Sequence, residues 1–131
     1  MIAFMDASAM VAIMTGEPEA FSLEKRYGQA EAVLCSAMSI WETVRAVARK
    51  RKVGVAVAHA EVETFIVDFA LRLVAIGESE TREAIMAHER YGKGNHPAKL
   101  NMGDCFAYAC AKTHGAELLY KGNDFAQTDL A

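Results

Sequence analysis

The stretch Ile2-Ala3-Phe4-Met5-Asp6-Ala7-Ser8 decides the fold. Residues 2–5 form a continuous apolar run, which is typical of a strand buried on both faces of a parallel sheet. The run ends on Asp6, and a short helical pattern follows at once over Ala9–Met14 and closes at Gly16. A carboxylate at the tip of a buried strand adds little to stability but is well placed for chemistry, so Asp6 is the first candidate functional residue.

The length and composition of the chain predict one folded domain over residues 1–131. Hydrophobic residues make up 53% of the chain, enough to build a core. No apolar run approaches the ~20 residues that a membrane-spanning helix needs, and no basic segment precedes the first apolar stretch as in a signal peptide. We therefore expect a cytoplasmic protein with no membrane segment. The three cysteines are too few and too scattered for a disulfide framework or a zinc site, and we expect buried thiols.

Helical and strand patterns alternate along the rest of the chain. We expect helices over about residues 18–28, 40–52, 55–71, 78–91 and 102–114, and strands over residues 32–35, 72–76 and 117–120. Pro18 suits the first turn of a helix, Gly54 and Gly115 suit helix ends, and Ser36 or Ser39 suits a helix cap. A last short edge element is expected before Ala131. This order predicts an α/β fold with a parallel sheet.

Four acidic residues follow strands or begin helices at what should be one edge of that sheet. They are Asp6, Glu42, Asp104 and Asp124. Ligands of open α/β sheets bind beyond the carboxyl ends of the strands, so these side chains are expected to face one another. Clustered carboxylates repel unless a cation lies among them. Hard divalent cations such as Mg²⁺ or Mn²⁺ take oxygen ligands and fit such a cluster.

Each acid also has a purely structural interpretation. Asp6 could cap the helix that follows it, with Ser8 as a polar residue of the first turn. Glu42 could be a solvated helix acid paired with Arg45 or Arg49. The other two positions have equally plain explanations, since Asn101 and Asp104 have the spacing of a capping box and Asp124 suits a turn. Only the shared topological position of the four acids argues for a site.

The chain resembles the PIN-domain ribonucleases, in particular the VapC-type toxins of bacterial toxin–antitoxin pairs. The resemblance runs over nearly the whole length and rests on the segments Met5–Ala9, Ser39–Glu42, Tyr91–Ala109 and Leu118–Phe125, followed by Thr128-Asp129-Leu130. The third segment, at its distance from the first, is the most specific. The resemblance implies a PIN-like α/β/α sandwich with a central, mainly parallel sheet of four to five strands.

The same resemblance implies metal-dependent endonucleolytic cleavage of RNA. It assigns Asp6 and Asp104 as ligands of Mg²⁺, or of Mn²⁺, with Glu42 as the third acid and Asp124 as the fourth. Three polar residues would support these acids, namely Ser8, Asn101 and Asn123. Many relatives carry an acid where this chain has Asn123, which leaves open whether Asn123 or Asp124 fills the fourth position. The implied partners are the RNA substrate and a VapB-like antitoxin.

Positive charge near the acids would grip the RNA despite the net charge of −3. The candidates are Arg45, Arg49, Lys93 and Lys121, and the alternative is a solvated, basic helix end at residues 49–52. The apolar stripes predict the core and a homodimer face. Two rival functions remain. One is a haloacid-dehalogenase-like phosphatase, but that family needs a second Asp two residues after its nucleophile, and this chain has Ser8 at that position. The other is a PIN-like binding module that no longer cuts RNA.

Overall fold

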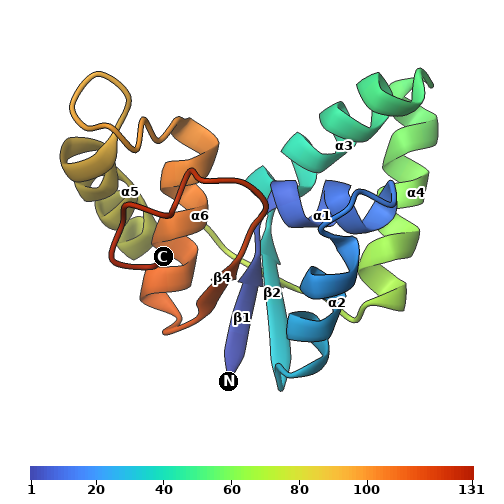
Figure 1. Cartoon of the computed structure of the whole chain (residues 1–131), viewed down its shortest axis with the longest axis horizontal. Coiled ribbons are helices and arrows are strands. Elements are labelled where there is room, and N and C mark those ends of the chain that lie inside the picture. Colours follow the sequence, from blue (N-terminus) through green and yellow to red (C-terminus); the bar gives the residue numbers. More distant parts are fainter.

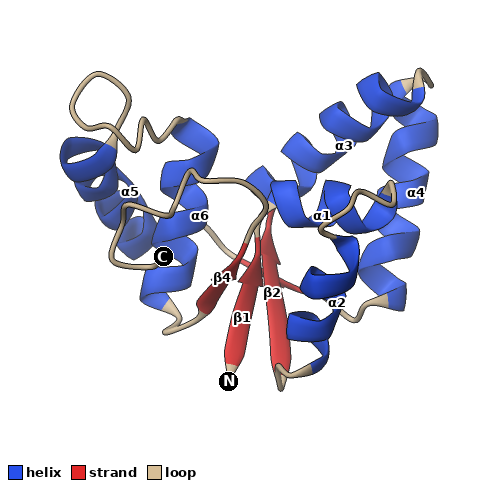
Figure 2. Ribbon diagram, viewed as in Figure 1, coloured by secondary structure: helices blue, strands red, loops and turns tan.

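Four parallel strands form the sheet at the centre of the molecule. The structure is a computed structural model that describes residues 1–131. The strands are β1 (Ile2–Met5), β2 (Ala32–Ser36), β3 (Arg72–Val74) and β4 (Glu117–Leu119), in the spatial order β3-β2-β1-β4 (Figures 1 and 2). Every neighbouring pair is parallel. The prediction of an α/β fold with a parallel sheet of four to five strands is confirmed, with four strands.

Six helices cover the two faces of this sheet. One side carries α5 (Glu78–Tyr91) and α6 (Met102–Thr113). The other side carries α1 (Ala7–Met14), α2 (Ala20–Gly28), α3 (Ala37–Arg51) and α4 (Val55–Asp68), of which α3 packs chiefly on α1 and α4 (Figure 2). The carboxyl ends of β1 and β2 lie between α6 and α3 (Figure 1). The predicted α/β/α sandwich is therefore present, and its open end is the edge where the acids were expected.

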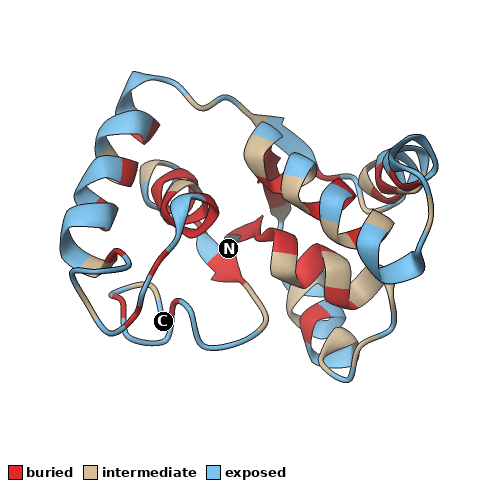
Figure 3. Cartoon of the chain, turned by 90° about the horizontal axis from the view of Figure 1, so that it is seen from above, coloured by how far each residue is buried: buried red, intermediate tan, exposed pale blue.

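The first strand is buried on both faces, as its continuous apolar sequence predicted. Phe4 points into the core beneath α5 and α6, whereas Ala3 and Met5 point into the core beneath α1, α2 and α4. All three residues are fully buried, and burying a side chain such as Phe or Met contributes about 1.5–3 kcal/mol. Figure 3 shows buried residues concentrated on the strands and on the helix faces turned towards them. This packing fixes the tip of β1, and with it Asp6.

Three helix starts differ from the prediction for local reasons. Helix α1 begins at Ala7, two residues before the predicted start at Ala9, because Asp6 is its N-cap. The second helix begins at Ala20 rather than at Pro18, because residues 18 and 19 form a turn before it. Helix α3 begins at Ala37, three residues earlier than expected, because Ser36 is its N-cap and forms a capping box with Ser39. The side chain of Ser36 accepts from the Ser39 backbone N–H at 3.2 Å. Glu42 therefore lies in the second turn of α3.

The remaining element ends shift by one to three residues. Helix α3 ends at Arg51 with Lys52 in the left-handed conformation (φ 56°), so the prediction that Gly54 ends it is wrong, and Gly54 instead caps α4. Helix α6 ends at Thr113, and Gly115 follows with a φ of +60°. The expected last edge element is absent, because the chain beyond Leu119 runs in turns to its end. The three cysteines are free and buried, as predicted, and none of the helices has the length and apolar character to cross a bilayer.

Candidate active site

Asp6 caps α1 and also faces the open end of the sheet. It directly follows β1 and is only 5% exposed. Its Oδ2 atom accepts hydrogen bonds from the backbone N–H and the hydroxyl of Ser8, at 3.1 Å and 2.6 Å. The structural interpretation of Asp6 as a cap is therefore correct. Capping leaves the other carboxylate oxygen of Asp6 free of hydrogen bonds from Ser8, because both of these bonds go to Oδ2.

Asp104 is held in the same manner at the start of α6. Its Oδ2 atom accepts from the Asn101 backbone N–H at 3.1 Å, while its own backbone N–H donates to the Asn101 side chain at 2.9 Å. The predicted capping box is present, and Asp104 is 7% exposed. A rigid helix start thus fixes a second buried carboxylate, and Asn101 supports it as expected.

Glu42 reaches the site from α3 and lies against α6. Its carboxylate sits on Gly103: a Cβ atom at that glycine would fall 2.0 Å from Oε2 of Glu42. Glu42 forms no ion pair with Arg45 or Arg49, so the interpretation of Glu42 as a paired surface acid is wrong. The absence of a side chain at Gly103 therefore leaves room for the Glu42 carboxylate at the start of α6, where the charge of Asp6 acts on it.

The fourth acidic position lies in the turn after β4. Asp124 is exposed, yet its charge and a hydrogen bond between the two carboxyls help to raise the pKa of Asp104. The backbone carbonyl of its neighbour, Asn123, accepts from the Ala126 N–H at 3.1 Å. The charge of Asp124 therefore acts on both Asp104 and Asp6.

Burial and mutual repulsion make the cluster electrostatically unfavourable without a cation. Burial is the main cause that raises the pKa of Asp6, Glu42 and Asp104, and it brings Glu42 to about 7 with help from the charge of Asp6. The charges of Asp124 and Asp6 raise the pKa of Asp104 further. None of the four acids has a salt-bridge partner. The protein itself thus provides no cation to compensate the charge of these carboxylates when they ionise.

An all-oxygen donor set with excess negative charge fits a hard divalent cation such as Mg²⁺ or Mn²⁺. No group of three His, Cys, Asp or Glu side chains converges closely enough to surround an ion alone. Mg²⁺ commonly keeps several waters and needs only one or two carboxylates from the protein. The residues present therefore fit Mg²⁺ held by Asp6 and Asp104, with water as the remaining ligands.

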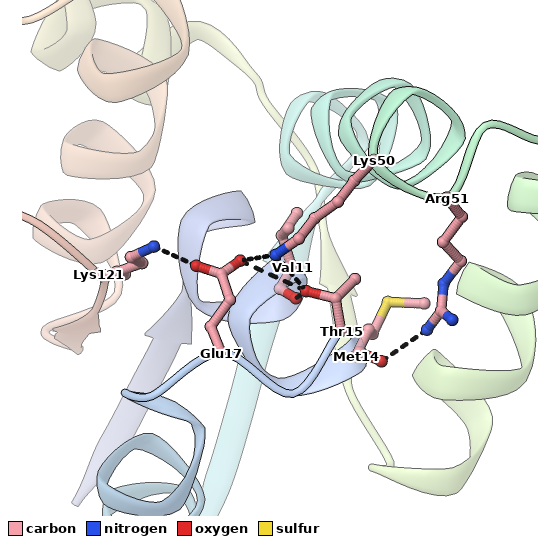
Figure 4. Close-up of polar contacts among 7 residues, drawn as sticks. All are labelled: Val11, Met14, Thr15, Glu17, Lys50, Arg51 and Lys121. Atoms are coloured by element: carbon pink, nitrogen blue, oxygen red, sulfur yellow. Dashed lines mark hydrogen bonds and ion pairs between the residues drawn. The ribbon is translucent and has the colours of Figure 1, made fainter.

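A second polar network, which the sequence did not reveal, connects the segment after β4 to Asp6 and to α3. The backbone N–H of Lys121 donates to the Ser8 hydroxyl at 3.0 Å, and this hydroxyl in turn donates to Asp6. The Lys121 ammonium bonds one carboxylate oxygen of Glu17, whose other oxygen accepts from Lys50 at 2.7 Å (Figure 4). These two lysines lower the pKa of Glu17 to about 2. Glu17, in an unremarkable Gly-Glu-Pro turn, thus joins three segments of the chain.

A cleft of about 400 Å³ adjoins the acids on the side of α3. It contains three of the four cations expected near the site, Arg45, Arg49 and Lys121. The fourth, Lys93, lies instead in a different groove between α5 and α6. The lining residues of the cleft are Ala7, Ser8, Val11, Glu17, Trp41, Glu42, Arg45, Ala46, Arg49 and Lys121. A cationic cleft that contains Glu42 can accept a polyanion next to the carboxylates.

Comparisons with known proteins show which family this chain belongs to. Residues 3–130 match the PIN domain family. A VapC ribonuclease of Rhizobium meliloti is 42% identical, with 98% of this chain and 99% of that protein covered. A ribonuclease VapC of Mycolicibacterium smegmatis is 39% identical, with 97% and 96% covered. Similarity at this level over whole chains shows the family.

Two solved structures share the fold at low sequence identity. One is VapC20 of Mycobacterium tuberculosis, described as a toxin that cleaves the sarcin–ricin loop, with a TM-score of 0.71, 17% identity and coverage of 96% of this chain and 93% of that one. The other is a toxin–antitoxin complex from Klebsiella pneumoniae, with a TM-score of 0.71, 18% identity and coverage of 98% and 93%. Both support the fold described above.

Proposed function

This chain belongs to the PIN-domain family and, within it, to the VapC ribonucleases, and from that premise we propose that it is an endoribonuclease that hydrolyses RNA phosphodiester bonds with a divalent cation. The observation that carries the proposal is that four carboxylates from four separate segments influence one another's charge at one end of the sheet, none with a cationic partner. Family membership argues against the phosphatase alternative.

In this mechanism each acid has a separate role. Asp6 and Asp104 would hold the cation, with Asp124 beside Asp104. When bound, Mg²⁺ lowers the pKa of water and neutralises charge that develops on the phosphate. Glu42, whose pKa is raised to about 7, would accept a proton from the attacking water near neutral pH.

The supporting residues would keep these acids and the substrate in place. Ser8 orients Asp6 through its hydroxyl, and Asn101 orients Asp104 through the capping box. Arg45 and Arg49 would bind phosphates of the flanking nucleotides, because they line the same cleft as Glu42. Lys121 would act mainly through its backbone bond to Ser8, since its ammonium is paired with Glu17.

Loss of one carboxylate without a change of shape tests the assignment. We expect Asp6→Asn and Asp104→Asn to lose Mg²⁺-dependent cleavage of RNA, and Asp68→Asn, an exposed acid at the end of α4, to keep it. Undiminished cleavage by both site variants would overturn the assignment. A wild-type protein that binds RNA but never cuts it would instead support the alternative of a PIN-like binding module.

The biological role that we propose is the toxin of a VapBC pair, neutralised by a protein antitoxin that covers the cleft. The similarity to VapC ribonucleases and to the toxin of a toxin–antitoxin complex supports this role. Expression of the chain alone should arrest growth, and co-expression with the adjacent small reading frame should restore it. Growth arrest by the Asp6→Asn variant as strong as that by the wild type would contradict a role through RNA cleavage.

We also propose a homodimer that uses the surface of α5 and α6. Three large apolar side chains are exposed there, namely Ile85 (63%), Met86 (48%) and Met102 (62%). Ile85 and Met102 line a largely apolar groove of about 420 Å³, and Met86 follows Ile85 on α5. Contiguous apolar surface of this kind is typical of protein interfaces. Light scattering on the purified chain should give the mass of two copies, and Met102→Glu should give one; a monomer in the wild type would refute the dimer.

A further inference from the structure

Trp41 is an exposed aromatic residue in an unusual place. Eleven large hydrophobic residues are exposed on this molecule, and Trp41, at 55% exposure, is the only one of them that lines the cleft beside the acids. It directly precedes Glu42 on α3. An indole normally buries much of its area in a core. Here the ring lies instead at the entrance to the proposed catalytic centre.

The surroundings of Trp41 are cationic rather than apolar. The Arg45 guanidinium lies over the indole, with its carbon 4.9 Å from the ring centroid. Arg49 lines the same cleft, and so does Lys121, whose ammonium pairs with Glu17. The one acid besides Glu42 in this lining, Glu17, is neutralised by its two lysine partners. The charge of the cleft therefore complements a phosphate backbone, while the ring offers a π-face.

We propose that Trp41 is a stacking platform for an unpaired base of the RNA, next to the scissile phosphate. This inference rests on the proposed ribonuclease function and extends it to the form of the substrate. Stacking on an aromatic side chain needs a base that is free of its partner, so the platform selects single strands and loops over duplex RNA. Arg45 holds the ring from one side and contacts the adjacent phosphate.

The single tryptophan of the chain makes this testable by fluorescence. The Asp6→Asn protein, which should bind RNA without cutting it, is titrated with a short single-stranded RNA oligonucleotide. We expect saturable quenching of Trp41 emission. The same oligonucleotide without its bases, or annealed to its complement, has the phosphates but no free base and should quench little.

Variants of Trp41 in the same background test the energetic role. Stacking is worth about 1–3 kcal/mol per base, so Trp41→Leu should weaken binding of the oligonucleotide roughly 5- to 150-fold. Trp41→Phe keeps a π-face and should recover much of the affinity. Leu and Phe are both apolar. If Trp41 had only a structural role or a protein-docking role, the two variants should therefore bind RNA with the same affinity.

Two results would overturn the inference: equal binding of the baseless and normal oligonucleotides, or wild-type affinity in Trp41→Leu. The second would show that the exposed ring contributes nothing to RNA binding. Cleavage of the same RNA by the wild-type protein, measured in parallel, separates this failure from a failure of the proposed function. Cleavage without quenching rejects only the stacking platform, whereas absence of both binding and cleavage rejects the ribonuclease assignment as well.

Discussion

We expect Gly103→Ala to remove most of the RNA cleavage activity while leaving the protein folded. Gly103 is the second residue of α6, and its backbone does not have a positive φ that alanine would resist. The added methyl would lie 2.0 Å from Oε2, 2.4 Å from Cδ and 2.5 Å from Oε1 of Glu42. Because ordinary contact begins at 3.4 Å, the nearest carboxylate oxygen must move by about 1.4 Å.

The magnitude follows from this displacement. A catalytic group that is misplaced by about 1 Å can cost ~10²-fold in rate, which corresponds to about 2.7 kcal/mol in the activation free energy. The free energy of unfolding should not fall, since the side chain of Glu42 can rotate away and alanine favours a helix over glycine by up to about 1 kcal/mol. Activity and stability should therefore move in opposite directions.

The assay is cleavage of a labelled single-stranded RNA, with stability measured by urea unfolding. Gly28→Ala is the matched control, because Gly28 ends α2 and a methyl there meets nothing within 4 Å. In a Glu42→Ala background, Gly103→Ala should have no further effect on cleavage, since the group that it displaces is already gone. Full activity of Gly103→Ala, or a further loss in the double variant, would refute the role given to Glu42.

Three further outcomes are expected. Because burial raises the pKa of Glu42 from 4.5 to about 7, the folded metal-free protein binds more protons than the unfolded chain in that range, and unfolding in EDTA should show stability falling as pH rises from 4.5 to 7. Asp6→Asn should raise the thermal unfolding midpoint of the metal-free protein at pH 8, because it removes a buried charge that repels the neighbouring carboxylates. An equal or lower midpoint would show that this repulsion does not destabilise the protein. Tyr108→Phe should cost about 1–3 kcal/mol in urea unfolding, since the buried hydroxyl donates to Asp129 at 2.7 Å, and an unchanged midpoint would show that this bond does not hold the C-terminal segment.

Much of the fold could be predicted from local sequence patterns. The apolar run before Asp6 indicated a doubly buried strand, and the alternation of patterns indicated a parallel sheet; both predictions are confirmed. Helix starts were predicted less accurately where the hydrogen bonds of a short capping side chain determine the first residue of the helix. Ser36 could be named as one of two caps, but only its hydrogen bond with Ser39 shows where α3 begins.

The site was predictable in its residues but not in its geometry. Strand ends and helix starts indicated which acids should meet, since the topology of a parallel sheet requires it. The contact between Glu42 and Gly103 joins positions far apart in the chain, and no local pattern records it. The same holds for Glu17, which contacts Lys121 across the cleft. Lys93 is the opposite case: it is near Asp104 in the sequence, but its side chain lines a different groove from the cleft beside the acids.

Titration calorimetry with Mg²⁺ or Mn²⁺ tests most directly whether the converging carboxylates form a metal site. We expect saturable binding to the wild-type protein, a loss of at least tenfold in affinity for Asp104→Asn, and wild-type affinity for the distant control Asp68→Asn. Equal affinity in the wild type and Asp104→Asn, or RNA cleavage that continues in EDTA, would contradict a catalytic metal site at these carboxylates.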